Sequence, residues 1–360
     1  MGGTFFPSGA AFLNTRTVGV GGQYPTITAA MADASSGDEV VADGGTYTES
    51  FTIPDGVTLT APAARIVGNI TAGAGCVINV YSVTGNGILS GTGTIWSYGL
   101  WTGNVTLSGT STWIHTGDVT GNLVVPDGCR AEVTGDVSGS VTLSGSGTAV
   151  VGGNIGGAIA LTGTAVLEAR GNAGSTVNVA ATASATIRGA VAGAITNAGL
   201  LLVESYVVGA VGSSGNTYIR GGVTGNATLT GGIAEIAGIV GDLTTSGSAL
   251  VSINAPLLIG NVVSSGTSGV IHQVPGYMTG NVTLTDTATA DLSTVAGNID
   301  SGNGTKAVIR GDLTGNSETN TSGSVKVYGD QPSGANTGTG LLWVAEDRID
   351  LIERRALSNW

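Results

Sequence analysis

Few side chains in this sequence of 360 residues are suited to acid–base or nucleophilic chemistry. Nucleophilic catalysis needs a positioned base, and the two histidines, His115 and His272, lie in no recognisable catalytic motif. We expect both at the surface, without a role. Zinc needs more His and Cys ligands at suitable spacing than the chain has, and the calcium-binding Gly-Gly-x-Gly-x-Asp nonapeptide is absent. The sequence predicts no catalytic residues, no metal and no cofactor.

Two carboxylates stand out because enzymes that cleave polysaccharides use paired acids. Asp118 and Asp136 are eighteen residues apart, and Asn154 and Asn172 occupy the same position in the next two repeats. Asp and Asn side chains both hydrogen-bond locally in turns. We therefore interpret the four residues as a ladder at a corner of the fold, and polysaccharide cleavage is kept as the alternative.

Aromatic residues cluster in one short stretch, as Trp96, Tyr98, Trp101 and Trp113. Trp96 and Trp113 occupy nearly equivalent repeat positions and are expected to form a flat, stacked, exposed patch. Large exposed apolar patches mark contact surfaces. Packing between subunits is the favoured role of this patch, with stacking on sugars and filling of the core as the alternatives.

A repeat of eighteen residues must position these side chains. The segment Thr102–Leu107 (Thr-Gly-Asn-Val-Thr-Leu) recurs in six consecutive steps between residues 84 and 192. Looser copies begin at Thr224, Gly241, Gly260, Thr279 and Thr314. Internal repeats of this kind indicate a solenoid, in which each repeat buries its apolar face against the next one.

One repeat also predicts the shape of a coil. Val141 and Leu143 alternate with Thr142, so one side of a short strand faces inward. Ala149 and Val151 form a second inward pair, and Val137 is a third inward position. Gly-Asn, Gly-Asp and Ser-Gly pairs between them suit tight corners. The predicted fold is an all-β, single-stranded parallel β-helix (β-solenoid) over residues 67–330, with about fourteen triangular coils stacked about 4.8 Å apart.

Composition excludes several classes of protein. Apolar residues make up 41% and charged residues 10%, which argues against disorder. The formal net charge of −12 and the absence of a basic run argue against nucleic-acid binding, and no apolar run is long enough for membrane insertion. Cys76 and Cys129 lie about three coils, or about 14 Å, apart and are expected to be buried thiols. Residues 1–22 show no secretory signal.

The two ends depart from the repeat. Residues 1–24 are interpreted as an arm, and residues 25–66 as a capping helix over 26–34 followed by the first coils. Residues 331–360 are interpreted as a linker followed by a short amphipathic helix over 341–360 that caps the solenoid or docks it. The candidate docking residues are Phe5, Phe6, Phe12, Ile349, Ile352 and Trp360.

The region from Val18 to Leu59 resembles the N-terminal cap and first coils of pectin-lyase-like parallel β-helices. The resemblance rests on Gly21-Gly22-x-Tyr24-Pro25-Thr26-Ile27, Ala29-Ala30-Met31, Gly37-Asp38-x-Val40 and Gly45-Thr46-Tyr47-x-Glu49. Such openings occur in carbohydrate-active enzymes and in bacteriophage tailspike-like and other virion surface proteins. The resemblance implies a right-handed helix with a short helix over its open end, although the coils of that family usually exceed eighteen residues.

These observations favour a non-enzymatic structural or adhesive surface protein. We expect a bacteriophage virion component, namely a spike, fibre or capsid decoration protein, assembled in the host cytoplasm and displayed on the virion surface. The expected partners are two further copies in a homotrimer, other head or tail proteins, and a host surface polysaccharide. The alternatives are a tailspike-like protein that binds or depolymerises polysaccharide and a fragment of a secreted bacterial adhesin.

Overall fold

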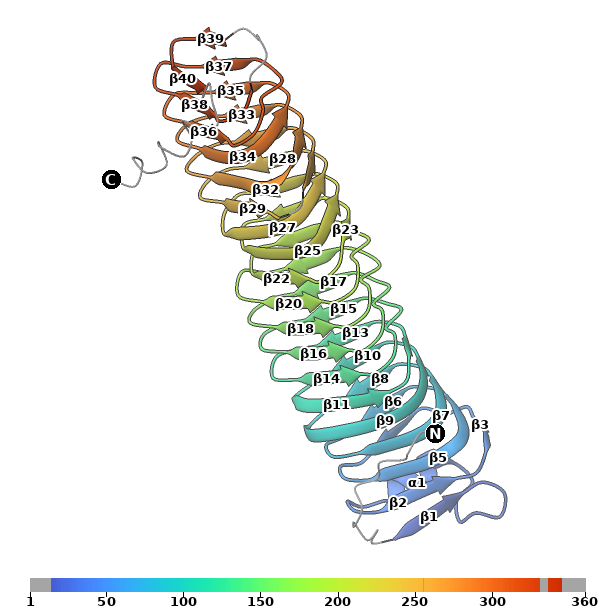
Figure 1. Ribbon diagram of the computed structural model, residues 1–360. Helices are drawn as coiled ribbons and strands as arrows, with labels where there is room; N and C mark the ends of the chain where they lie inside the picture. The colour runs from blue at the N-terminus through green and yellow to red at the C-terminus, as the bar shows by residue number, and fades with distance from the viewer. Residues whose placement is uncertain (1–13, 255, 331–335, 345–360) are drawn as a thin grey trace. The chain divides into compact units, whose positions relative to one another are not determined.

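The computed structural model describes residues 14–254, 256–330 and 336–344. It is a parallel β-solenoid of about 16 turns with coils of about 18 residues, which confirms the predicted fold class (Figure 1). The chain divides into two compact units, Met1–Gly171 and Asn172–Trp360.

The predicted helix over residues 26–34 is present as α1, Ile27–Asp33. The Thr26 side chain caps its first turn by accepting a hydrogen bond of 3.1 Å from the Ala29 N–H. The Glu49 carboxylate accepts two more, from the N–H groups of Ile27 (3.0 Å) and Thr28 (2.8 Å). Ile27, Ala30 and Met31 are buried. The helix therefore turns an apolar side towards the first coils, and the Glu49 carboxylate, which lies between strands β3 (Gly45–Tyr47) and β4 (Phe51–Ile53), satisfies two of its free N–H groups.

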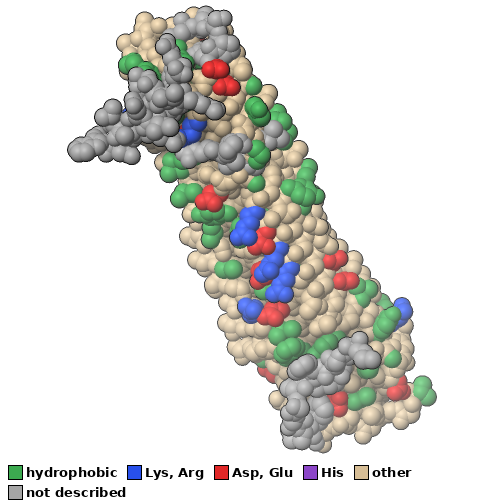
Figure 2. Space-filling model, viewed as in Figure 1, with side chains coloured by type: hydrophobic (Ala, Val, Ile, Leu, Met, Phe, Trp, Pro, Cys, Tyr) green, Lys and Arg blue, Asp and Glu red, His purple; other side chains and the backbone are tan. Residues whose placement is uncertain are grey.

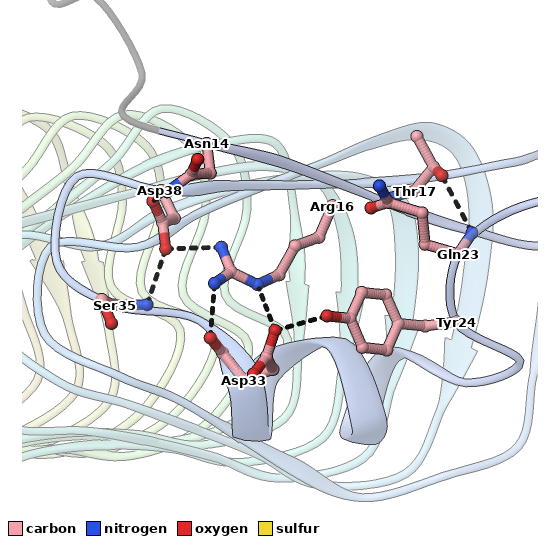
Figure 3. A network of polar contacts seen from close by, with 8 residues as sticks. All are labelled: Asn14, Arg16, Thr17, Gln23, Tyr24, Asp33, Ser35 and Asp38. Carbon is pink, nitrogen blue, oxygen red and sulfur yellow. Dashed lines mark hydrogen bonds and ion pairs between the residues drawn. The ribbon is translucent and has the colours of Figure 1, made fainter.

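A polar network joins α1 to the first strand (Figure 3). The Arg16 guanidinium donates to the carboxylate of Asp38 at 2.5 Å and to that of Asp33 at 3.2 Å. The Tyr24 hydroxyl also donates to Asp33. Asp38 is buried, and the Ser35 N–H, followed by the Arg16 guanidinium, holds the pKa of the Asp38 carboxyl below its usual value. This network gives a structural role to Asp38, one of the residues on which the family resemblance rests.

The first unit contains two parallel sheets, named here sheet A and sheet B. Sheet A consists of β1 (Thr15–Val18), β2 (Glu39–Ala42), β3 (Gly45–Tyr47), β5 (Thr58–Val67), β7 (Val77–Thr84), β9 (Thr92–Thr102), β11 (Thr110–Thr116), β12 (Val119–Thr120), β14 (Arg130–Val133), β16 (Thr148–Val151) and β18 (Val166–Ala169). Sheet B consists of β4 (Phe51–Ile53), β6 (Ile70–Ala72), β8 (Gly87–Leu89), β10 (Val105–Leu107), β13 (Leu123–Val125), β15 (Val141–Leu143) and β17 (Ile159–Leu161).

The second unit repeats this arrangement. Its sheet A consists of β20 (Ser184–Ile187), β22 (Leu200–Val203), β23 (Val207–Val208), β25 (Asn216–Thr224), β27 (Ile233–Val240), β29 (Leu250–Ile253), β30 (Leu257–Ile259), β32 (Gly269–Thr279), β34 (Thr289–Ala296), β36 (Lys306–Ile309), β38 (Ser324–Val327) and β40 (Leu341–Val344). Its sheet B consists of β19 (Val177–Val179), β21 (Ile195–Asn197), β24 (Val211–Ser213), β26 (Ala227–Leu229), β28 (Leu243–Thr245), β31 (Val262–Ser264), β33 (Val282–Leu284), β35 (Ile299–Ser301), β37 (Ser317–Thr319) and β39 (Asn336–Gly338).

The predicted apolar columns form the core of the first unit. Val105, Leu123, Val141 and Ile159 pair in register at eighteen-residue steps, and all four are fully buried. The third inward position is also confirmed, since Val137 forms single parallel bridges with Val119 and Ile155. Each coil therefore buries its aliphatic side chains against identical positions in the coils beside it.

Coil length is less regular in the second unit. Strands β21, β24, β26 and β28 pair at steps of sixteen residues, and β28, β31 and β33 at steps of nineteen and twenty. Sheet B keeps its three-residue strands throughout, whereas sheet A contains strands of four to eleven residues next to one another. The changes in coil length are therefore absorbed by sheet A and the corners.

Side-chain ladders hold the corners together. In the first unit, Oδ1 of Asn86 accepts a hydrogen bond from the Asn104 N–H (3.0 Å), and Oδ1 of Asn104 accepts one from the Asn122 N–H (2.9 Å). At another corner, Asp118 accepts from the Asp136 N–H at 2.9 Å and Asp136 from the Asn154 N–H at 2.6 Å. The interpretation of Asp118 and Asp136 as a corner ladder is thus confirmed.

Removing one ladder side chain should cost about 1 kcal/mol, the typical net contribution of one hydrogen bond. Asn122→Ala leaves the Ser140 N–H without the acceptor that it has at 2.8 Å. Asn122→Asp is the matched control, because it keeps an oxygen at Oδ1. Denaturant-induced unfolding measures both variants. Equal stability of Asn122→Ala and the wild type would show that water replaces the ladder bond at no cost.

The end of the chain differs from the prediction. Strands β39 and β40 pair in parallel with β37 and β38, so the linker and the amphipathic helix are wrong for residues 336–344. Leu342 and Val344 align with the buried Val325 and Val327, so this segment continues the columns of sheet A, and residues 345–360 of the predicted helix lie outside the described residues. At the other end, β1 lies within the predicted arm and pairs with β2. The candidate docking residues Phe5, Phe6, Phe12, Ile349, Ile352 and Trp360 lie outside the described residues.

Candidate functional site

Two of the four aromatic residues of the predicted contact patch lie in the core. Trp101 and Trp113 are 1% and 0% exposed. Trp113 pairs in register with Ile95, and Trp96 pairs with Ile114. A difference of one position reverses the side of the sheet that a residue faces. The expected stacking of Trp96 on Trp113 is therefore wrong, and core filling describes Trp101 and Trp113.

His115 is buried as well, which corrects its expected surface position. Its ring stacks on Trp113 at a centroid distance of 5.0 Å and an interplanar angle of 19°, and the Trp101 ring meets Trp113 edge-on at 6.0 Å. Trp113 Nε1 donates to Ser97 Oγ at 2.7 Å, and Ser97 Oγ lies 2.8 Å from His115 Nδ1. These side chains form a compact polar–aromatic cluster inside the first unit.

The contacts of this cluster favour the neutral form of His115. His115 Nε2 lies 3.4 Å from the Asp118 carbonyl oxygen, which can only accept, so the proton belongs on Nε2 and the Ser97 hydroxyl donates to Nδ1. Burial lowers the pKa of His115 to about 4, and the Asp118 and Ser97 contacts offset this only in part. A histidine that is neutral and enclosed at neutral pH has no access to a substrate.

His272 repeats this arrangement in the second unit. It is fully buried and aligns with Leu292, and its Nδ1 lies 2.8 Å from Ser293 Oγ. The expectation of a surface position is wrong here too. In both places a serine hydroxyl lies within hydrogen-bonding distance of a buried imidazole.

Trp96 and Tyr98 remain on the outer side of sheet A, where both are half-buried. Trp96 aligns with Val77 on one side and Ile114 on the other, and Tyr98 aligns with Asn79. Sheet A therefore carries a small apolar area of Val77, Trp96 and Ile114 in the first unit. A role for it in contacts between subunits stays a prediction.

The outer side of sheet A in the second unit carries a groove of about 610 Å³. Thr186, Leu202, Tyr218 and Glu235 follow one another in register along four consecutive strands. Arg220 and Asn254 also line the groove, and Leu200, which is 47% exposed, borders it. Arg220 NH1 lies 3.8 Å from Glu204 Oε1. The groove thus combines an aromatic ring and aliphatic side chains with a guanidinium, a carboxylate and an amide.

The sequence did not point to this groove. Its residues come from coils of sixteen and seventeen residues, so a step of eighteen from Tyr218 arrives at Ile236, which is buried, instead of Glu235. The sequence contains one local indication of the groove. Tyr218 and Arg220 are two residues apart, and therefore their side chains lie on the same side of a strand.

Other chemistry is sparse. Among residues 14–254, 256–330 and 336–344, no group of three or more His, Cys, Asp or Glu side chains could hold a metal ion. Cys76 and Cys129 are free, buried thiols, and burial raises the pKa of Cys76 to about 11, which makes this thiol unreactive at neutral pH. In the same residues no helix is long and apolar enough to cross a membrane.

The surface is dominated by small polar residues. Most of the view in Figure 2 consists of side chains that are neither charged nor hydrophobic, together with the backbone. The fold is consistent with a pectin-lyase-like β-helix. Comparisons with protein-family models, with curated proteins and with solved structures gave no match.

Proposed function

We propose that this protein is a non-enzymatic structural or adhesive surface element. The proposal rests on the contacts between neighbouring coils. Columns of buried aliphatic side chains and ladders of Asn and Asp side chains join each coil to the next. Both histidines, both cysteines and the Asp118–Asp136 pair serve this framework. Such a scaffold is suited to presenting a surface at a distance from its attachment point.

Within this class, we propose a bacteriophage virion component that forms a homotrimer and docks on head or tail proteins. The resemblance of residues 18–59 to the first coils of tailspike-like proteins supports this proposal, and the roles of Glu49 and Asp38 in holding α1 agree with it. A surface poor in lysine and rich in Thr, Ser and Asn, with a net charge of −12, suits a protein displayed to solvent.

Purified virions test the proposal directly. Mass spectrometry is expected to find the protein in particles at a fixed copy number, and electron microscopy with an antibody against the chain is expected to label one position on the head or tail. Absence of the protein from particles, with the chain found only in the lysate or on the bacterial surface, would favour the adhesin alternative and overturn the virion proposal.

The groove of sheet A supports a second candidate function, binding of a surface polysaccharide. A sugar ring stacks on an aromatic side chain while its hydroxyls take hydrogen bonds from charged and amide groups. Tyr218, Arg220 and Asn254 offer this combination in one groove. The groove is open, as binding to an internal segment of a long chain requires.

Tyr218→Ala should weaken polysaccharide binding at least tenfold, because it removes the stacking surface. Tyr206→Ala is the matched control, since Tyr206 is 53% exposed in the same unit and does not line the groove. Glycan-array screening followed by calorimetry measures the effect. Release of oligosaccharides by the wild type would show that the protein is an enzyme, and equal binding by the two variants would place the glycan elsewhere.

A further inference from the structure

Positive charge is confined to one side of the coils. Each of the nine Lys and Arg residues within the described part of the chain lies in a sheet A strand or directly after one: Arg16, Arg65, Arg130, Arg170, Arg188, Arg220, Lys306, Arg310 and Lys326. The sheet B strands of both units contain none. The pattern holds separately in each unit, so it describes the coil itself.

The chain's only two lysines occupy neighbouring coils. Lys306 lies in β36 and Lys326 in β38, which are adjacent in sheet A of the second unit. Lys306 is exposed. The Lys326 ammonium lies 4.7 Å from the centre of the Trp343 ring and 5.1 Å from that of Tyr328. These cation–π contacts hold the Lys326 charge at the surface beside an apolar area.

The same two coils carry acids on sheet B. Asp300 lies in β35 and Glu318 in β37, and the two residues pair in register. Both are exposed, and they line a shallow hollow of about 340 Å³ with Asn281, Asn298 and Asn316. Like charges placed opposite each other destabilise a sheet. No cation among the described residues pairs with either carboxylate, so nothing in that part of the chain relieves this repulsion.

We propose that copies of this chain assemble side by side, with the Lys306–Lys326 side of one copy packed against the Asp300–Glu318 side of the next. A rotation about an axis parallel to the coil stack keeps each coil at the same height. Because the lysines and the acids belong to the same two coils, they meet without any shift along the axis. The two sides differ, so the contact is heterologous, and a rotation of one third of a turn between copies closes it into the ring of a trimer.

The exposed side chains beside the lysines add apolar area to this contact. Leu341, which is 71% exposed, aligns with Ser324 next to Lys326, and the Trp343 and Tyr328 rings pack edge-on with their centres 5.6 Å apart. Aromatic residues are enriched at the centre of protein interfaces, and charged groups such as the two lysines belong to the surrounding rim. The lysine side therefore offers both an apolar anchor and charges that complement the opposite side.

A second copy fits these observations better than an anionic glycan does. The chain carries both halves of the charge pair at one height, whereas a glycan would use the lysines and leave Asp300 and Glu318 unpaired. The proposal specifies the contact of the homotrimer proposed above, and it does not depend on the virion assignment, because it is tested on purified protein.

Charge reversal of each side separately gives a decisive test. The variant Lys306→Glu/Lys326→Glu is negative on both sides, and Asp300→Lys/Glu318→Lys is positive on both. Light scattering after size-exclusion chromatography should give the mass of a trimer for the wild type. For each variant alone, the dissociation constant of the assembly should be at least about tenfold higher. An equimolar mixture of the two variants should associate more tightly than either variant alone and form assemblies that contain both chains, because each contact between unlike variants again joins opposite charges.

Glu204→Lys/Glu235→Lys is the matched control, with the same charge change as the acid variant on sheet A of the same unit. It should assemble as the wild type does, and circular dichroism should show every variant folded. A monomeric wild type, variants that assemble unchanged, or a mixture that associates no better than either variant alone would each overturn the proposal. A monomeric wild type that binds an acidic polysaccharide through the lysines would identify a glycan as the occupant instead.

Discussion

Lowering the pH from 7 to 4 is expected to destabilise the first unit by about 3 kcal/mol through His115 alone. The pKa of His115 is lowered to about 4 in the folded chain by burial, against about 6.5 in the unfolded chain. Each unit of pKa difference corresponds to about 1.4 kcal/mol. The expected effect is a large part of the stability of a typical domain.

The sign follows from proton binding. Between pH 6.5 and 4 the unfolded chain binds a proton at His115 and the folded chain does not, so acid favours unfolding. The stabilisation is fully present above about pH 6.5 and is lost as the pH falls towards 4. Asp118 is the charged residue nearest the ring, and its attraction for the imidazolium is too weak to compensate for burial.

The double variant Ser97→Ala/His115→Leu isolates this effect. It removes the titrating imidazole and its hydroxyl partner, and it leaves the buried Trp113 N–H without its acceptor, so the stability at pH 7 should fall by about 1–3 kcal/mol while the pH dependence due to His115 disappears. Urea unfolding is followed by fluorescence in a Trp343→Phe/Trp360→Phe background, in which the remaining tryptophans all belong to the first unit. The pH dependence of the variant should be flatter by about 3 kcal/mol. Identical pH profiles would mean that His115 is protonated or solvated in the folded chain.

Trp113→Ala is expected to cost about 3–5 kcal/mol, the usual range for deleting a large buried aromatic side chain. The side chain is fully buried between the His115 and Trp101 rings, so the surrounding coils cannot close the cavity without shifting the register. The substitution also removes the indole N–H that donates a hydrogen bond to Ser97 Oγ. Denaturant unfolding followed by circular dichroism measures the change.

Trp96→Ala provides the comparison for the tryptophan prediction. Trp96 lies one strand away from Trp113 but is half-buried on the outer side, so its replacement should cost about 1 kcal/mol or less. Trp113→Phe separates ring packing from the hydrogen bond and should lie between the two alanine variants. Similar costs for Trp96→Ala and Trp113→Ala would contradict the assignment of the two residues to opposite sides of the sheet.

The eighteen-residue repeat predicted the fold because one inward column determines the whole coil. Once Val141 is aligned with Leu123 and Ile159, the remaining inward and outward positions follow from alternation along each strand. The corner role of Asp118 and Asp136 followed for the same reason, since their position in the repeat could be compared with that of Asn154.

The positions of the candidate-site side chains depend on small departures from the repeat and on unequal coil lengths, which the eighteen-residue period does not contain. Trp96 and Trp113 are seventeen residues apart, and that difference of one from the repeat was enough to place their side chains on opposite sides. The burial of His115 and His272 was hidden by polar neighbours, because their serine partners, Ser97 and Ser293, satisfy them inside the core. The groove around Tyr218 required coil lengths that only the structure provides.

The corner ladders have a consequence for how such a chain changes over generations. The side-chain oxygen of each ladder Asn or Asp accepts a hydrogen bond from a backbone N–H in the next coil. Its own backbone N–H donates to a side-chain oxygen in the preceding coil, and Asn104 and Asn122 make the same contacts. Inserting or deleting one whole period in the DNA leaves every remaining ladder residue with equivalent neighbours. The length of the protein can therefore be adjusted in single-coil steps by recombination between its own repeats, and the coils of sixteen, nineteen and twenty residues in the second unit show that sheet B pairing also tolerates smaller changes of length within a coil.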